Sequence, residues 1–184
     1  MNNTTTETLA TTKWTLDPAH SEVQFKVKHL MISNVTGTFT ELGAEVELQG
    51  DDLADAKVDF RANVNSVDTG SADRDKHLKS ADFFDADHFP KLEFRSTSSS
   101  KSGDAYTVTG DLTIKNVTKP VTLKVEWSGF ATDPWGNTKA GLSFMGRIDR
   151  RDFGLTWNAA LEAGGVLVSD EVRLLGEVQL VKAK

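Results

Sequence analysis

Apolar and polar residues alternate along most of this chain. In the first such run, residues 23–31, the odd positions are apolar except for His29, and the even positions are mostly charged or polar. Side chains of a β-strand point alternately to opposite faces, so this pattern gives a strand one dry face and one wet face. The alternation recurs at residues 42–48, 58–64, 92–94, 106–114, 121–127, 140–148 and 172–180. The sequence therefore predicts an all-β fold of about eight strands.

Five glycines interrupt the dry side of this pattern: Gly37, Gly110, Gly129, Gly146 and Gly176. At each of them the buried face of a strand has no side chain. One interpretation is that they mark bends where the sheet curls into a closed barrel. The other is that they leave room inside it. Both interpretations predict a barrel with an apolar cavity.

Turn residues separate the alternating runs. All four prolines are placed between strands, where a missing N–H breaks no ladder, and the stretch from Ser96 to Ser102 is interpreted as a polar loop. Strands of ten or eleven residues would reach about 35 Å at about 3.3 Å per residue. The prediction is an elongated antiparallel meander.

One segment, residues 71–81, shows no alternation. It carries Asp73 and Asp75 early and Lys76 and Lys79 late, which suits the dipole of a short helix. Adjacent Phe83 and Phe84 follow it, and at least one of these rings is expected to plug the barrel end. This helix is predicted to act as a lid.

Composition narrows the function classes. The 184 residues carry a net charge of −6 and no basic stripe, which argues against nucleic-acid binding. Cysteine is absent, which excludes disulfides and thiol chemistry. We expect a polar, disordered leader over residues 1–12 and one domain over residues 13–184. No signal peptide or membrane-spanning segment is recognised, so we expect a cytoplasmic protein, or a periplasmic one if a signal has been removed.

The four histidines show no spacing typical of a metal site, and no metal is expected. His29 lies on the dry side of its run. We expect a buried neutral imidazole with a hydrogen-bonding neighbour, and ligand contact is the alternative.

No catalytic constellation is found, because the nearest approach to a nucleophile elbow, residues 141–146, has the wrong spacing. Cationic residues near the predicted helix are candidates for a rim that fixes a polar head group. They are Arg74, His77, Lys79, Arg150 and Arg151.

Several strings resemble the YceI-like family of polyisoprenoid-binding proteins. They occur in order at residues 14–29, 37–39, 66–69, 74–85, 89–94, 110–113 and 151–155. The resemblance covers about residues 14–182. It implies an extended eight-stranded antiparallel lipocalin-like barrel around a long-chain lipid, and dimerisation in some members. The matched strings imply these ligand-contacting residues: Phe25, Val27, His29, Phe39, Arg74, His77, Phe83, Phe84, Leu112 and Phe153.

The resulting hypothesis is a non-catalytic protein that carries or sequesters an isoprenoid quinone, a polyprenyl phosphate or a related lipid, without a separate cofactor. The alternating pattern adds these interior residues to the expected ligand site: Val46, Phe60, Phe94, Val125, Trp127, Phe144 and Leu174. Three alternatives remain open: binding of a fatty-acyl chain or other amphiphile, a lipid-modifying enzyme that uses His29 or His77 as a base, and a solid sandwich that serves protein interaction.

Overall fold

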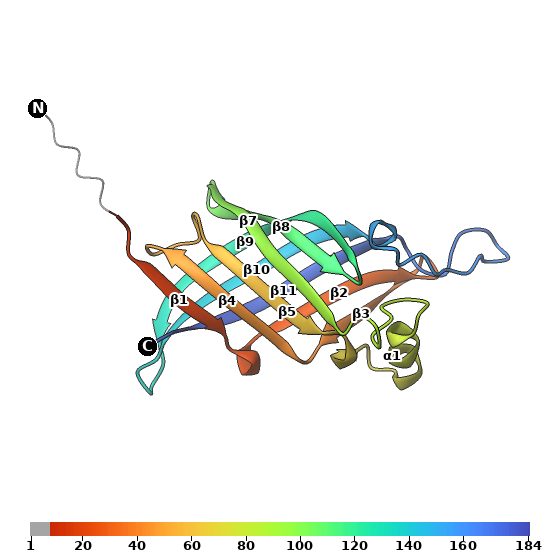
Figure 1. Cartoon of the computed structure of the whole chain (residues 1–184). Helices are drawn as coiled ribbons and strands as arrows, with labels where there is room; N and C mark the ends of the chain where they lie inside the picture. Colours follow the sequence, from red (N-terminus) through yellow and green to blue (C-terminus); the bar gives the residue numbers. More distant parts are fainter. Residues whose placement is uncertain (1–7) are drawn as a thin grey trace, which may run out of the picture.

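The computed structural model describes residues 8–184 and consists mainly of antiparallel strands (Figure 1). The strands are β1 (Thr11–Leu16), β2 (Glu22–His29), β3 (Ser33–Phe39), β4 (Leu42–Gln49), β5 (Lys57–Asn63), β6 (Val67–Asp68), β7 (Lys91–Ser102), β8 (Ala105–Ile114), β9 (Val117–Thr132), β10 (Thr138–Asp149) and β11 (Glu171–Lys182). One α-helix, α1 (Ala72–Lys79), and three short 3₁₀ turns, η1 (Pro18–His20), η2 (Val64–Ser66) and η3 (Arg150–Phe153), complete the described chain.

Eight of the strands close into a barrel in the order β1, β4, β5, β7, β8, β9, β10, β11 and back to β1. The closing pair joins Trp14 of β1 to Lys182 of β11. The predicted all-β, lipocalin-like barrel with one short helix is confirmed.

A second group of strands extends the wall at one end of the barrel. β1 pairs with β11 only through residues 14–16, and β2 pairs with β11 further along, through residues 22–26. β3 then pairs with β2, and β6 with β3. The alternating pattern had placed β2 among the eight strands and had not identified β1 or β3.

The predicted helix is present, and Ser71 caps it by accepting a hydrogen bond from the backbone N–H of Arg74. Phe83 and Phe84 follow in a turn, and both side chains are buried. The ring of Phe84 meets the ring of Phe39 edge-on, with centroids 6.0 Å apart. Both rings therefore plug the end of the barrel near α1, as expected.

Three local expectations were wrong. Thr11 and Thr12 belong to β1, so the leader does not reach residue 12, and its first seven residues lie outside the described part. The stretch from Ser96 to Ser102 continues β7, with a bulge between Ser96 and Ser98. Pro120 lies inside β9, opposite Asp111 of β8. β9 pairs with β10 only from Lys124 onward, so Pro120 lies on an edge, where a missing N–H is tolerated.

Candidate functional site

An apolar cavity of about 160 Å³ occupies the middle of the barrel, and we call it the central cavity. Its wall is built by the inward positions of the alternating strands. Nine of the expected ligand residues line it: Phe25, Phe39, Val46, Phe60, Phe94, Leu112, Val125, Phe144 and Leu174. The remaining lining residues are almost all aliphatic, so the central cavity suits a hydrocarbon chain.

A second cavity of about 230 Å³, the end cavity, lies next to it beneath α1. The two cavities share Phe25, Phe39, Leu92, Ile114, Ile148 and Leu174, so they are adjacent within the barrel. The other expected residues in the end cavity are Val27, His29, Arg74, His77, Phe83 and Phe84. Arg74 is exposed, so the end cavity reaches the surface beside α1. Together the two cavities reach the lower part of the size range of small-molecule sites, roughly 300–1,000 Å³.

Neighbouring side chains cover four of the five glycines. Phe25 lies over Gly37, Phe94 over Gly110, Leu123 over Gly146 and Phe144 over Gly176. The side chains fill the positions that the glycines leave empty, and in doing so they lie along the wall. Gly129 differs, because its φ is +84°, it lies at the bulge where β9 slips against β10, and a Cβ there would meet open space. Gly129 is therefore the one that marks a bend.

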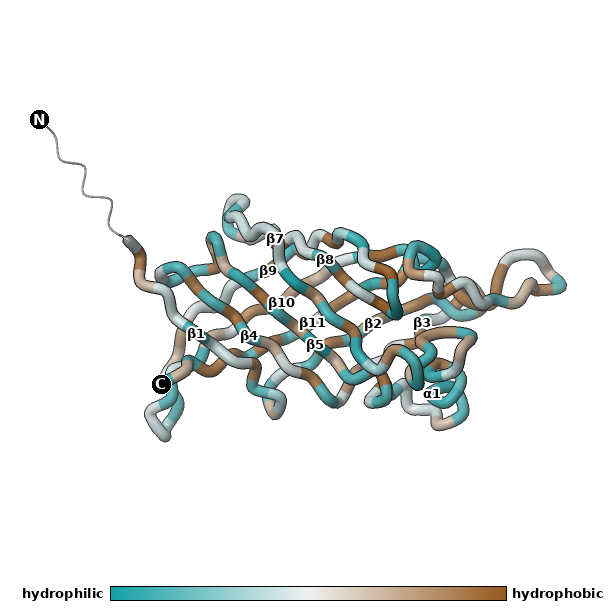
Figure 2. Tube along the Cα trace, in the orientation of Figure 1, coloured by the Kyte–Doolittle hydropathy of each residue, from teal (hydrophilic) through white to brown (hydrophobic). Residues whose placement is uncertain are grey.

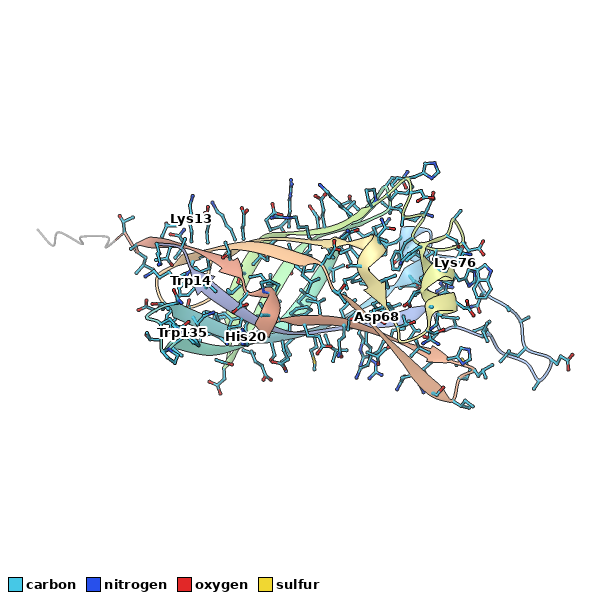
Figure 3. All side chains as sticks on the ribbon, turned by 90° about the horizontal axis from the view of Figure 1, so that it is seen from below. Lys13, Trp14, His20, Asp68, Lys76 and Trp135 are labelled. Atoms are coloured by element: carbon cyan, nitrogen blue, oxygen red, sulfur yellow. The ribbon has the colours of Figure 1, made fainter. Side chains whose placement is uncertain are left out.

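Two of the expected ligand residues line neither cavity. Phe153 is 1% exposed and packs in the solid core at η3. Trp127 packs edge-on against Phe130 at 5.5 Å, and Phe130 stacks on Trp14 at 5.3 Å. Figure 3 places Trp14 at the end of the barrel opposite Lys76 of α1. The alternation correctly predicted that Trp127 faces inward, but it could not show that aromatic rings fill this end of the barrel.

Arg74 and Arg151, two of the five cations expected at the rim, are engaged by the protein itself. Arg74 donates from Nε to Thr69 Oγ1 and from Nη2 to Thr69 O, both at 2.7 Å. Arg151 is paired with Asp149 at 2.6 Å and with Asp170 at 3.5 Å. Its hydrogen bond holds the pKa of Asp149 at about 2. These groups stabilise the rim and are not free to bind a head group.

Arg150 is only 3% exposed and holds the loop of residues 155–170. Its guanidinium donates to four backbone carbonyls, those of Leu155, Trp157, Val168 and Ser169. Burial lowers its pKa below the ordinary value, and the charge of Asp170 opposes this. Arg150 acts as a structural staple, although it contributes to the wall of the end cavity.

The two histidines of the end cavity have different surroundings. His77 Nε2 lies 2.8 Å from Asp82 Oδ2, and its ring meets Trp157 edge-on at 4.7 Å. His29 was expected to be buried with a hydrogen-bonding neighbour. Instead it is half-buried, and its ring makes no hydrogen bond to any other residue in the described part of the chain. The His29 ring is therefore available to a polar group inside the cavity.

Alternation could not reveal every residue of this site. Leu155, Trp157, Leu167 and Val168 line the end cavity from an irregular loop, where no periodicity marks the inward positions. Thr69 also lines this cavity. In the sequence, only the short family-like string at residues 66–69 pointed to it.

The comparison with known families agrees with this geometry. Residues 14–180 match the YceI-like domain. The chain belongs to the YceI-like family. Protein YceI of Salmonella newport is 39% identical over 165 residues, which cover 90% of this chain and 83% of that protein. A UPF0312 protein of Staphylococcus aureus is 39% identical over 163 residues, covering 88% and 93%.

Solved structures share the fold of this YceI-like protein. The YceI protein of Campylobacter jejuni superimposes with a TM-score of 0.71 at 35% identity, covering 92% of this chain and 97% of that one. BcnA of Burkholderia cenocepacia gives a TM-score of 0.75 at 25% identity, covering 89% and 98%. A polyisoprenoid binding domain from Saccharophagus degradans gives 0.62 at 14% identity, covering 92% and 98%, which supports the fold alone.

Metal-binding clusters and membrane-spanning helices are both missing from the described chain. Within residues 8–184, no group of three or more His, Asp or Glu side chains is placed to hold a metal ion. No helix in the same part of the chain is long and apolar enough to span a membrane.

Proposed function

We propose that this protein binds and carries a long-chain isoprenoid lipid, such as an isoprenoid quinone or a polyprenyl phosphate. The observation that carries the proposal is the pair of adjacent apolar cavities inside the barrel, whose few polar side chains lie mostly at the α1 end. A hydrocarbon tail would lie in the central cavity, and a polar head would lie near His29. The Saccharophagus degradans protein, a polyisoprenoid binding domain, has the same barrel architecture, which is compatible with this ligand class.

Apolar contact is sufficient for such a ligand. Burying about 20 carbons at roughly 0.8 kcal/mol each contributes about 16 kcal/mol. Association and ordering cost about 4–15 kcal/mol. A head group therefore needs only a few polar contacts to set its orientation, and the half-buried imidazole of His29 provides one.

The enzyme alternative receives less support from the geometry. A general base needs a nucleophile or water within hydrogen-bond reach. In the described chain the hydrogen-bond partner of His77 is Asp82, and the nearby hydroxyl of Thr69 is already held by Asp75 and Arg74. We therefore propose a role in binding without turnover.

Native mass spectrometry of protein purified without detergent tests the proposal. The wild-type protein should carry a lipid of defined mass or take up an added polyprenyl alcohol at one per chain. Val108→Trp fills the central cavity and should abolish uptake, whereas Thr107→Trp, on the outer face of the same strand, should not. Absence of both co-purified lipid and uptake would reject carriage. Preferred uptake of a straight fatty acid would favour the fatty-acyl alternative, and conversion of the lipid that is lost in His77→Ala would favour an enzyme.

A further inference from the structure

The turn between β2 and β3 displays apolar residues in an unfavourable backbone conformation. Leu30 and Met31 have φ values of 53° and 62°, and the N–H of Ile32 donates to the carbonyl of His29 at 3.2 Å. Two consecutive positive φ values at the centre of a hairpin turn normally select Asn and Gly. Here the side chains of Leu30, Met31 and Ile32 are 39%, 51% and 83% exposed. The turn thus holds residues that are unfavourable in its backbone conformation and whose apolar side chains are exposed to water.

A second apolar segment lies against this turn. Residues 159–168 contain one charged residue, Glu162, among ten. The N–H of Leu30 donates to the carbonyl of Leu167 at 2.9 Å, and His29 forms a bridge with Val168. We call residues 30–32 and 159–168 the apolar tip. Figure 1 shows the β2–β3 turn and this loop projecting from the end of the barrel opposite the termini, and Figure 2 shows the same view coloured by hydropathy.

The apolar tip adjoins the wall of the end cavity. His29, Leu167 and Val168 line that cavity and lie beside or within the tip. A surface bound by the tip would therefore lie next to the end cavity.

A row of cations lies behind the tip on the outer face of the barrel. Lys26, Arg173 and Arg147 are direct register partners across β2, β11 and β10. Like charges directly opposite each other destabilise a sheet. Arg147 has Glu171 at 3.8 Å, but Lys26 and Arg173 have no ion pair within residues 8–184. The nearest acidic groups in register, Glu171 and its partner Asp149, are already paired with Arg147 and Arg151.

The spacing of the tip and the cations suits a membrane interface. Lys28 is exposed and lies two residues from Leu30, which is about 7 Å along the strand, and the cation row begins about 13 Å away. Interfacial elements insert about 5–10 Å. The side chain of Lys28 would then reach the head groups, and the row would lie within about a Debye length of an anionic surface.

We propose that the apolar tip docks on an anionic lipid bilayer, from which the cavity exchanges its ligand. This step rests on the proposed carrier function. A protein partner or a second copy fits less well, because a stable interface needs about 800 Å² per partner and the tip exposes only three sizeable apolar side chains at its turn.

Vesicle co-sedimentation tests the docking. Wild-type protein should bind vesicles of phosphatidylcholine mixed with phosphatidylglycerol, and binding should weaken as salt is added. The double change Leu30→Asn and Met31→Gly gives the turn its preferred residues, so it should fold normally and lose about tenfold or more in partitioning. Arg173→Gln should cost about fivefold on these vesicles and nothing on phosphatidylcholine alone. Trp135→Ser, an 83% exposed residue at the opposite end in Figure 3, is the matched control and should bind normally.

Uptake of a water-soluble short prenyl alcohol, measured without vesicles, separates docking from carriage. The Leu30→Asn and Met31→Gly protein should retain this uptake. Failure of the wild type to bind vesicles, or unchanged binding by the double variant, would overturn docking whatever the uptake. Failure of the wild type to take up any prenyl ligand would instead reject carriage. If the wild type sediments as a dimer and the double variant sediments as a monomer, the tip is a protein interface. That result would also overturn docking.

Discussion

The ring of Phe144 on β10 lies over Gly176 on β11. The two residues are direct register partners, and the Cε1, Cζ and Cδ1 atoms of the ring occupy the place where a Cβ of residue 176 would stand. The missing side chain thus gives the ring room to lie along the barrel wall. Phe25 and Gly37 repeat the relationship between β2 and β3. These pairs hold the half-buried rings against the barrel wall, where they line the central cavity.

We expect Gly176→Ala to lower lipid capacity. The new methyl group would displace the Phe144 ring into the central cavity, and overpacking of this kind typically costs about 1–3 kcal/mol of unfolding free energy. Native mass spectrometry with added polyprenyl alcohol, together with urea unfolding, measures both effects. Gly141→Ala is the control on β10, because a Cβ there meets only Ser128, at 3.4 Å. Equal capacity in the two variants would mean that the ring positions do not shape the cavity.

Gly129→Leu should leave lipid capacity unchanged and lower stability. Gly129 lines neither cavity, so a side chain there should stay out of both, but the φ of +84° strains any L-residue by about 1–2 kcal/mol. Thermal unfolding and the same uptake measurement check the two halves of this prediction. A lowered capacity would show that Gly129 borders the lumen.

The alternating pattern predicted much of this barrel because a strand between water and an apolar lumen must alternate. It placed Phe60 and Phe94 on the lumen correctly. The pattern was wrong where a segment does not lie between water and the apolar lumen. Pro120 was interpreted as a break because an edge strand cannot be distinguished from a loop before the pairing is known.

The end cavity was harder to predict for a related reason. Trp157 lies in an irregular loop that is positioned by the guanidinium of Arg150, and neither residue carries a periodic signal. The resemblance to a family supplied His29, Arg74 and His77, but it could not show that Arg74 is held by Thr69 while the ring of His29 is left without a partner in the described chain. Such differences depend on side-chain contacts between distant segments.

Arg150→Met should destabilise the loop of residues 155–170. The change leaves buried carbonyls without donors, and each such group costs about 1–3 kcal/mol. Hydrogen exchange should accelerate in this loop, and lipid retention should fall because Leu155 and Trp157 line the end cavity. Arg151→Met is the neighbouring control. Its ion pairs are solvent-exposed and contribute little to stability, so similar losses in both variants would show that Arg150 does not hold the loop.

Stability should fall between about pH 4 and pH 2 through Asp17. Hydrogen bonds from Lys139, at 2.7 Å, and from His20 lower the pKa of this carboxyl from 3.8 to about 2. A folded-state pKa below the unfolded value means that the stabilisation is present above pH 4 and is lost as the carboxylate is protonated. After discounting for partial solvent access, we expect a contribution of about 1–2 kcal/mol.

Urea unfolding at several pH values should show a shallower acid dependence in Asp17→Asn. The control Asp59→Asn, which removes an exposed pair with Arg95, should keep the wild-type dependence. If Asp17→Asn were as acid-sensitive as the wild type, the interaction of Asp17 with Lys139 would not account for the loss of stability at low pH.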